Sequence, residues 1–166
     1  MATRLNKPHW LPTPQLEQWL SLVSVFTLLP GALDAQLTKD SGLTHYEYMV
    51  MSMLAEANDR TLRMSELALR TNASLSRLSH VATKLEKRGL VARAACPDDA
   101  RATDLRLTRS GLALWLESAS GHLAEVRRLV VDNLTVQELA TLANINRKLI
   151  SQLDPEAKLE LRKPKA

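Results

Sequence analysis

Hydrophobic residues recur every three or four positions through most of the chain, the spacing that places them on one face of an α-helix. The pattern predicts six helices, over residues 14–39, 44–57, 64–70, 75–88, 109–133 and 136–153. Pro30-Gly31 falls inside the first of them, so we expect a kink or a break near Leu29. The predicted fold class is therefore mainly α.

Residues that favour caps and turns mark the helix ends. Residues 135–138, Thr-Val-Gln-Glu, have the form of a capping box, a specific start signal. Gly42 and Gly89 suit helix C-termini, where a left-handed residue is often needed. Asn72 tolerates that conformation and Ser74 is a good N-cap, so a tight turn should join the third and fourth helices.

After Gly89 the hydrophobic period changes from helical to alternating. Residues 90–95 and 104–107 have the pattern of two short strands around a polar turn at residues 96–103, with Leu107 as the better core candidate. Helix, tight turn, capped helix, glycine stop and hairpin follow in that order. This order predicts a winged helix-turn-helix with a small β-hairpin wing, whose helix over residues 75–88 fits the DNA major groove.

Positive charge is concentrated in the same part of the chain. The net charge is +4, but residues 60–109 hold eleven basic and five acidic residues, a net +6, which leaves −2 for the rest. A basic segment in an otherwise slightly acidic chain is typical of a polyanion-binding surface. Charge alone leaves open the alternative of a solvated helical face.

Composition argues against several other classes. The chain is 45% hydrophobic and 24% charged, which is typical of a globular protein rather than a disordered one. The single cysteine excludes a disulfide framework, and the four histidines have no metal-ligand spacing, so we expect neither metal nor cofactor. A nucleophile–base pair and a glycine-rich phosphate loop are both missing, so we expect no enzyme activity. A protein-binding winged helix remains an alternative.

The sequence also predicts a cytoplasmic protein without a membrane segment. No apolar run approaches the roughly 18 to 20 residues that span a bilayer. The N-terminus, MATRLNKPHWLP, lacks the apolar core of a signal peptide.

The segment MSELALRTNASLSRLSHVATKLEKRGLV, followed by PDDARATDLRLTRSG, resembles the MarR-type bacterial transcription regulators. The most specific parts are Asp99-x-Arg101 with the following Leu107-Thr108 and Gly111, and the segment over residues 85–91. The resemblance covers residues 14–153, and the opening segment is similar to actinobacterial members. Asn72 stands where the family usually has glycine, and it supplies the same backbone geometry.

The resemblance implies a ligand-responsive repressor that binds a pseudo-palindromic double-stranded DNA operator as a homodimer. Residues 14–43 and 109–153 would form the helical dimerisation region, with interlocking terminal helices. Residues 44–108 would form the DNA-binding domain, and residues 1–13 and 154–166 would be flexible ends.

Candidate DNA contacts lie on the helix-turn-helix and the wing. They are Ser65, Ser74, Ser76, Arg77, His80, Lys84, Lys87, Asp99 and Arg101. Arg77 is the best base reader because a guanidinium can grip guanine O6 and N7 together, whereas Lys84 and Lys87 suit the DNA backbone. For Arg77 and His80 the alternatives are an exposed, solvated arginine and a structural surface histidine.

The candidate residues of the wing have more than one interpretation. The resemblance implies that Arg101 enters an A·T-rich minor groove while Asp99 orients it or braces the turn, and a plain hairpin salt bridge is the alternative. Redox sensing by Cys96 is disfavoured, since family members that sense redox state usually carry the reactive cysteine near the first helix.

A pocket for a small aromatic or phenolic effector would be lined by Trp19, His45, Tyr46 and Trp115, with Trp10 nearby. The alternative is that these are core or interface residues.

Overall fold

The computed structural model describes residues 9–96 and 99–156. Its helices are α1 (Thr13–Ser41), α2 (His45–Glu56), α3 (Met64–Arg70), α4 (Leu75–Lys87), α5 (Arg109–Leu129) and α6 (Val136–Leu153), with 3₁₀ turns η1 (Asn58–Arg60) and η2 (Val131–Asn133). Its strands are β1 (Thr61–Arg63), β2 (Val91–Cys96) and β3 (Asp99–Leu107). A mainly α winged helix-turn-helix fold is therefore confirmed.

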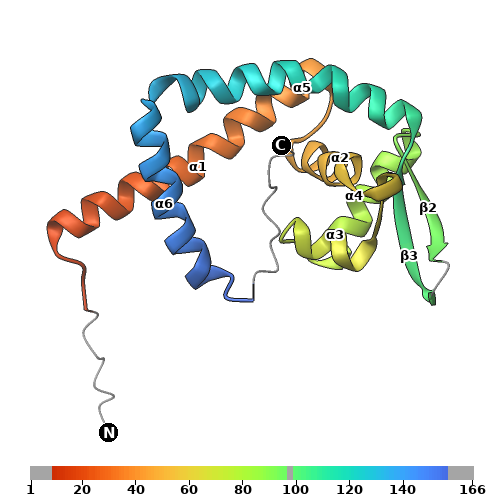
Figure 1. Ribbon diagram of the computed structural model, residues 1–166, viewed down its shortest axis with the longest axis horizontal. Coiled ribbons are helices and arrows are strands. Elements are labelled where there is room, and N and C mark those ends of the chain that lie inside the picture. Colours follow the sequence, from red (N-terminus) through yellow and green to blue (C-terminus); the bar gives the residue numbers. More distant parts are fainter. Residues whose placement is uncertain (1–8, 97–98, 157–166) are drawn as a thin grey trace, which may run out of the picture.

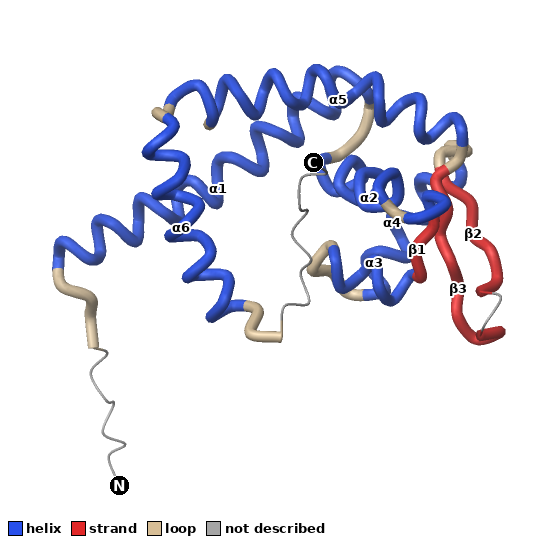
Figure 2. The backbone as a smooth tube through the Cα atoms, in the orientation of Figure 1, coloured by secondary structure: helices blue, strands red, loops and turns tan. Residues whose placement is uncertain are grey.

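The molecule has a compact head and a long helical arm (Figure 1). The head contains α2, α3, α4 and the sheet. The arm contains α1 and α5, which lie side by side, and α6, which turns back from the far end of α5. The strands form one antiparallel sheet in the order β1-β3-β2, and the β2–β3 hairpin projects at one edge of the molecule (Figure 2).

One hydrophobic core holds the head together and reaches the C-terminal end of α1. It includes Leu37 of α1, Met51 of α2 and Leu67 of α3, all fully buried. Burying an aliphatic side chain of this size stabilises the fold by about 1.5–3 kcal/mol. In β3 both Leu105 and Leu107 are buried, as expected for alternate residues that share one face of a strand, and Leu107 is not the better core residue of the two.

The inner face of α4 is slightly different from the predicted one. Leu78 and Leu85 are fully buried as expected, but Val81 is only half-buried and Ala82 is fully buried. The helix therefore presents its smaller side chain where it packs most closely, which lets α4 approach the rest of the head.

Helix α1 is continuous, so of the two outcomes expected near Leu29, a kink or a break, the break is wrong. It begins at Thr13 with Pro14 in its first turn, and it ends at Gly42, which has a φ of 63°. Pro30 removes one N–H from a 29-residue helix, and the hydrogen-bonded turns on both sides keep the helix in one piece.

Helix α1 is also more apolar than a count of uninterrupted residues suggests. Among the residues that the structure covers, it is the one helix long and apolar enough to cross a membrane by length and composition, with a mean hydropathy of 1.5 over its most apolar 18-residue window. The expectation that no segment reaches this threshold is therefore wrong, because serine and threonine interrupt the apolar run without lowering its mean much. Length and composition are weak evidence of a span, and the C-terminal half of α1 packs on the core of the head through Leu37.

The wing is longer than predicted and has a third strand. The β3 strand begins at Asp99, so the connection is shorter than the expected turn over residues 96–103. The short strand β1, which the pattern does not predict, pairs with β3 through Leu62 and Leu105. Three residues are too few for a visible alternation, and their pairing depends on the neighbouring strand rather than on local preference.

The expected caps and stops are present. Asn72 has a φ of 48°, Ser74 Oγ accepts from the Arg77 N–H at 3.2 Å, and Gly89 has a φ of 71°. The capping box at Thr135 has both of its hydrogen bonds. Helix α5 ends at Leu129, four residues earlier than predicted, and a 3₁₀ turn follows.

Gly111 is required by close packing at the start of α5. A Cβ at this position would lie 2.1 Å from the Leu90 carbonyl oxygen, well inside contact distance. The glycine therefore lets α5 begin directly against the turn that follows α4, which fixes the arm on the head.

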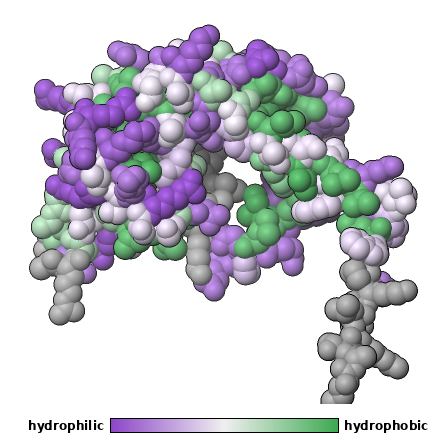
Figure 3. All heavy atoms as spheres, turned by 180° about the vertical axis from the view of Figure 1, so that it is seen from behind, coloured by the Kyte–Doolittle hydropathy of each residue, from purple (hydrophilic) through white to green (hydrophobic). Residues whose placement is uncertain are grey.

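The arm exposes much of its hydrophobic surface. Helix α6 buries none of its residues, although its start is marked by a complete capping box. Figure 3 shows hydrophobic residues gathered along the N-terminal half of α1. The large hydrophobic side chains that are exposed on the arm and just before it are Trp10, Leu11, Leu16, Trp19, Leu20, Val25, Phe26, Leu28, Leu116, Leu123, Val136, Leu142, Ile145, Leu149 and Leu153. A surface of this extent is typical of an interaction site.

Candidate nucleic-acid interface

The outer face of α4 is a polar stripe. Ser76, His80, Thr83 and Lys87 are exposed and follow one another at spacings of four, three and four residues. This spacing places them on one side of the helix, opposite the buried Leu78 and its neighbours. We call these four residues the outer stripe. The Ser76 hydroxyl, the His80 imidazole and the Lys87 ammonium are able to hydrogen bond to bases or phosphates. The Thr83 hydroxyl is already used within the protein, since it donates to the Ser79 carbonyl oxygen at 2.9 Å and accepts from Arg93 at 2.9 Å.

A second pair of basic residues lies on the flank of α4 that faces α2. Arg77 and Lys84 are seven residues apart, so they share one side of the helix. The Arg77 Cζ lies 4.6 Å from the centroid of the Tyr46 ring, a cation–π contact. The Lys84 Nζ lies 2.8 Å from Glu47 Oε1. Both side chains are thus held by neighbouring residues of α2.

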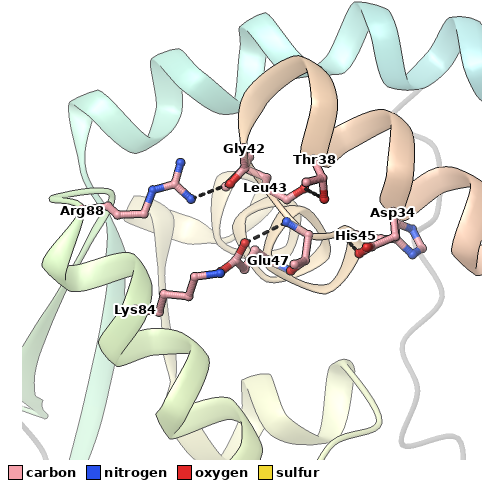
Figure 4. A network of polar contacts seen from close by, with 9 residues as sticks. Asp34, Thr38, Gly42, Leu43, His45, Glu47, Lys84 and Arg88 are labelled. Atoms are coloured by element: carbon pink, nitrogen blue, oxygen red, sulfur yellow. Dashed lines mark hydrogen bonds and ion pairs between the residues drawn. The ribbon is translucent and has the colours of Figure 1, made fainter.

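Glu47 is a buried carboxylate of α2 that joins this helix to α4 through Lys84 (Figure 4). Its side chain is 2% exposed and also closes the capping box of α2, accepting from the Thr44 N–H at 2.8 Å. Burial raises the pKa of Glu47, but the hydrogen bonds from Lys84 and Thr44 outweigh it, and the net pKa is below the ordinary value. Glu47 is therefore ionised at neutral pH.

The same network reaches the end of α1. Arg88, just after α4, donates from Nη1 to the Gly42 carbonyl oxygen at 2.9 Å. The His45 N–H donates to Asp34 Oδ1 at 2.8 Å (Figure 4). The C-terminal end of α1, the start of α2 and the second half of α4 are thus tied together by hydrogen bonds and one ion pair.

Arg93 of the wing holds the opposite flank of α4. Its guanidinium donates to the Ser79 carbonyl oxygen at 2.8 Å and to Thr83 Oγ1 at 2.9 Å, and it forms an ion pair with Glu86. The Arg93 N–H also donates to Glu86 Oε1, and this backbone hydrogen bond lowers the pKa of Glu86. Helix α4 is therefore fixed between α2 and the wing, with the outer stripe between the two sets of contacts.

The turn end of the wing is joined to β1. Arg63 donates from Nη2 to Cys96 Sγ at 3.1 Å, and its Nη1 lies 3.9 Å from Asp99 Oδ2. Asp99 therefore braces the sheet through Arg63. A cavity of about 360 Å³ lies between α3, α4 and this part of the wing, and Ser65 and Ser79 are among the residues that line it.

The structure brings most of the candidate DNA contacts to one side of the head. Ser76, His80 and Lys87 belong to the outer stripe, Arg77 lies at its edge, and Ser65 is exposed in the first turn of α3. Ser74 is used as the N-cap of α4. The charge of Lys84 is paired with Glu47, so Lys84 is a weaker candidate for phosphate than Lys87. Arg101 lies in β3, and its side chain is outside the part of the structure that is described.

The four effector candidates do not line one cavity among the described residues. Trp19 is 50% exposed on α1, and Tyr46 lies beside Arg77. Trp115 donates from Nε1 to Ser52 Oγ at 2.9 Å and packs against the core. His45 lies beside His122 of α5. The structure favours the alternative that these are core or contact residues, most directly for Tyr46 and Trp115.

Sequence reasoning missed the residues that hold α4 in place. In the sequence, nothing distinguishes these residues from ordinary charged surface residues. They are Glu47, Glu86 and Arg93. One local signal exists for Glu47, because Thr44-x-x-Glu47 is a second capping box. The Arg93 contacts join residues seven to fourteen positions apart across a turn, and no local pattern indicates them.

A histidine pair lies where α2 meets the arm. The His45 and His122 ring centroids are 5.8 Å apart, and the Tyr48 ring centroid lies 4.6 Å from that of His122. Burial lowers the pKa of His45, an effect that the nearby Asp34 carboxylate opposes. Burial, and then the charge of His45, lower the pKa of His122. The folded protein therefore favours both histidines in the neutral form.

This pair predicts a loss of stability in mild acid. As the pH falls below about 6.5, the unfolded chain takes up protons that the folded protein resists, so the free energy of unfolding decreases. His122→Phe should keep the ring contacts and flatten the decrease between pH 7.5 and 5.5, as measured by thermal unfolding. His9→Asn, at an exposed position, is the control. A wild-type slope in the His122→Phe variant would contradict the assignment.

The head has the architecture of a winged helix-turn-helix DNA-binding protein, with an exposed polar face on α4 beside a β-hairpin wing. Residues 41–102 match a family model described as the MarR family. Sco3205 from Streptomyces coelicolor, a MarR family regulator solved in complex with DNA, is similar with a TM-score of 0.86 and 38% identity, covering 94% of this chain and 97% of that one. The chain belongs to the MarR family of transcriptional regulators.

Two other similar proteins are also transcriptional regulators. AbsC, also a MarR family regulator from Streptomyces coelicolor, has a TM-score of 0.84 and 34% identity over 88% of this chain and 98% of its own. The transcriptional repressor MdtR of Bacillus subtilis (strain 168) is 28% identical over 144 residues, which are 87% of this chain and 90% of that protein. These relatives are transcriptional regulators, so the prediction that the protein is not an enzyme is confirmed.

Proposed function

We propose that this protein is a repressor that binds a specific double-stranded DNA sequence by inserting α4 into the major groove. The observation that carries the proposal is the outer stripe, which stays exposed while contacts from α2 and the wing hold both flanks of α4. A polar helix face held in place next to a β-hairpin wing matches the docking geometry of this class. The DNA complex of Sco3205 and the repressor activity in the name of MdtR support the proposal.

The proposal assigns a role to each side chain. Ser76 and His80 meet base edges near the N-terminal end of α4, and Lys87 meets a phosphate further along. Arg77 reads guanine at the edge of the stripe. Ser65 contacts the backbone from α3. Arg101 enters the minor groove beside the head, and Asp99 supports the wing through Arg63.

We further propose that the working unit is a homodimer built by the arm. A helix of 18 residues that buries none of them is incomplete in a single chain, and α1 and α5 expose hydrophobic residues beside it. Residues 14–43 and 109–153 would form this interface, and residues 44–108 would form each reading head. Two heads related by a two-fold axis would read a pseudo-palindromic operator in the cytoplasm, and a small aromatic effector would act at the junction of arm and head.

Salt dependence tests the DNA-binding proposal against a winged helix that binds proteins. Binding to a random duplex should weaken steeply between 50 and 200 mM salt (about a thousandfold if some six phosphates are neutralised), because counterions are released from each contacted phosphate. Lys87→Met should reduce the slope of log K against log salt by about one per head. Undetectable binding at low salt, or a flat salt dependence, would contradict the proposal.

Replacing Arg77 should reduce specificity more than general affinity. Removal of a bidentate guanine contact costs about 1–3 kcal/mol per half-site, so Arg77→Ala should weaken binding to a selected duplex while random-duplex binding changes little. Arg147→Ala, which removes the same charge from an exposed position on α6, is the control. Equal losses on selected and random duplexes would identify Arg77 as a phosphate contact instead.

A further inference from the structure

We infer that Tyr46 is a positioning residue for DNA reading, which holds the Arg77 guanidinium at the edge of α4 before DNA arrives. The inference rests on the proposed function of α4. It gives Tyr46 a role that differs from the effector contact expected from the sequence.

The ring of Tyr46 is itself held in place. Its hydroxyl lies 3.1 Å from Thr71 Oγ1, and Thr71 Oγ1 in turn lies 2.8 Å from the Leu67 carbonyl oxygen, to which it donates. Because the Thr71 proton is used on Leu67, the Tyr46 hydroxyl is the donor to Thr71. Thr71 is buried at the end of α3, so this chain of hydrogen bonds anchors the ring to the turn between α3 and α4.

Arg77 lies over the face of this anchored ring. The distance of 4.6 Å from Cζ to the ring centroid is within cation–π range, and Arg77 is otherwise exposed. A guanidinium that stacks on a ring still presents N–H donors in its own plane. The contact therefore restricts the orientation of the side chain and leaves its donors available for a base.

Restricting the Arg77 side chain before DNA binds should raise the affinity for DNA by a measurable amount. An arginine that is free in solution loses rotamer freedom when it binds, and a side chain that is already ordered loses less. Together with the loss of the cation–π contact, removal of the ring should weaken specific binding by about three- to tenfold. A ring without the hydroxyl keeps the stacking surface and should preserve most of the effect.

A double-mutant cycle tests this role. Tyr46→Leu and Tyr46→Phe are each measured with Arg77 present and in the Arg77→Ala background. The probes are a duplex selected by the wild-type protein from a random pool and an unselected duplex of equal length. Tyr46→Leu should weaken binding to the selected duplex three- to tenfold with Arg77 present and have no further effect in Arg77→Ala. Tyr46→Phe should stay within about twofold of wild type.

The outcomes separate this inference from the proposed function. Wild-type preference for the selected duplex supports DNA reading, and an equal Tyr46→Leu loss in both backgrounds or on both duplexes would then overturn the positioning role alone. A wild type without any preference overturns both. If Tyr46→Leu does not fold, NMR of the free protein decides, because the ring should shift the Arg77 side-chain resonances upfield in wild type and Tyr46→Phe. Resonances at ordinary arginine positions would overturn the inference.

Discussion

The double substitution Ile145→Glu and Leu149→Glu is expected to convert the protein from a dimer to a monomer and to abolish tight operator binding. Both side chains lie on the exposed hydrophobic side of α6, at 49% and 38% exposure. Two carboxylates on this face would have to lose their hydration in any interface between the arms. A monomer presents only one head to DNA, so affinity for a two-half-site duplex should fall by roughly a hundredfold or more.

Sedimentation measures the change from dimer to monomer, and titration with a two-half-site duplex measures the loss of DNA affinity. The matched control is Ala140→Glu with Ser151→Glu, which adds the same charge to exposed positions on the other side of α6. The control should remain a dimer with near wild-type affinity. A stable dimer in the Ile145→Glu and Leu149→Glu protein, or a stable wild-type monomer at micromolar concentration, would contradict the proposed arm interface.

Lys84→Met is expected to destabilise the fold by about 2 kcal/mol at neutral pH, although Lys84 is itself half-exposed. The substitution leaves the Glu47 carboxylate, 2% exposed, without its cation. The effect should be smaller than the roughly 3–5 kcal/mol of a fully buried pair, because Lys84 is 56% exposed and water reaches it. Equilibrium denaturation measures the loss.

The pH dependence of this loss identifies its cause. In wild type the lowered pKa of Glu47 contributes stability that is present above its ordinary value of 4.5 and is lost as the pH falls through the folded value. Without Lys84 the pKa of Glu47 rises, and acidification neutralises the unpaired carboxylate. The difference between Lys84→Met and wild type should therefore shrink towards pH 4.

Lys87→Met is the control for Lys84→Met, in both stability and DNA binding. Lys87 is exposed on the outer stripe, so its replacement should leave stability unchanged and weaken salt-dependent DNA binding. A destabilisation by Lys84→Met that is the same at pH 4 and pH 7.5 would contradict the role of Glu47.

Periodicity and cap residues were sufficient to predict most of the helical framework. The left-handed Asn72, the Ser74 cap and the glycine stops are local features, and the structure confirms each of them. The misses are non-local. Pro30 is tolerated because a long helix surrounds it, and β1 exists because β3 offers it a partner.

The candidate interface was only partly predictable for the same reason. The outward direction of Ser76 and His80 follows from helical spacing alone. The contacts that distinguish Arg77 from Lys84 depend on which residues α2 places opposite them, Tyr46 in one case and Glu47 in the other. Arg93 looked like one of several basic residues, and only the packing of the wing on α4 shows that it holds the helix.

Selection of binding sites from a random duplex pool tests the central claim most directly. Two reading heads related by a two-fold axis, each inserting α4, should enrich two inverted half-sites whose centres lie about 10 base pairs, or one helical turn, apart. The combined substitution Ser76→Ala and His80→Ala should abolish or alter the enriched half-site while the protein remains folded. A pool without enrichment, or the same enriched half-site with and without these two side chains, would contradict the claim that the outer stripe of α4 reads DNA.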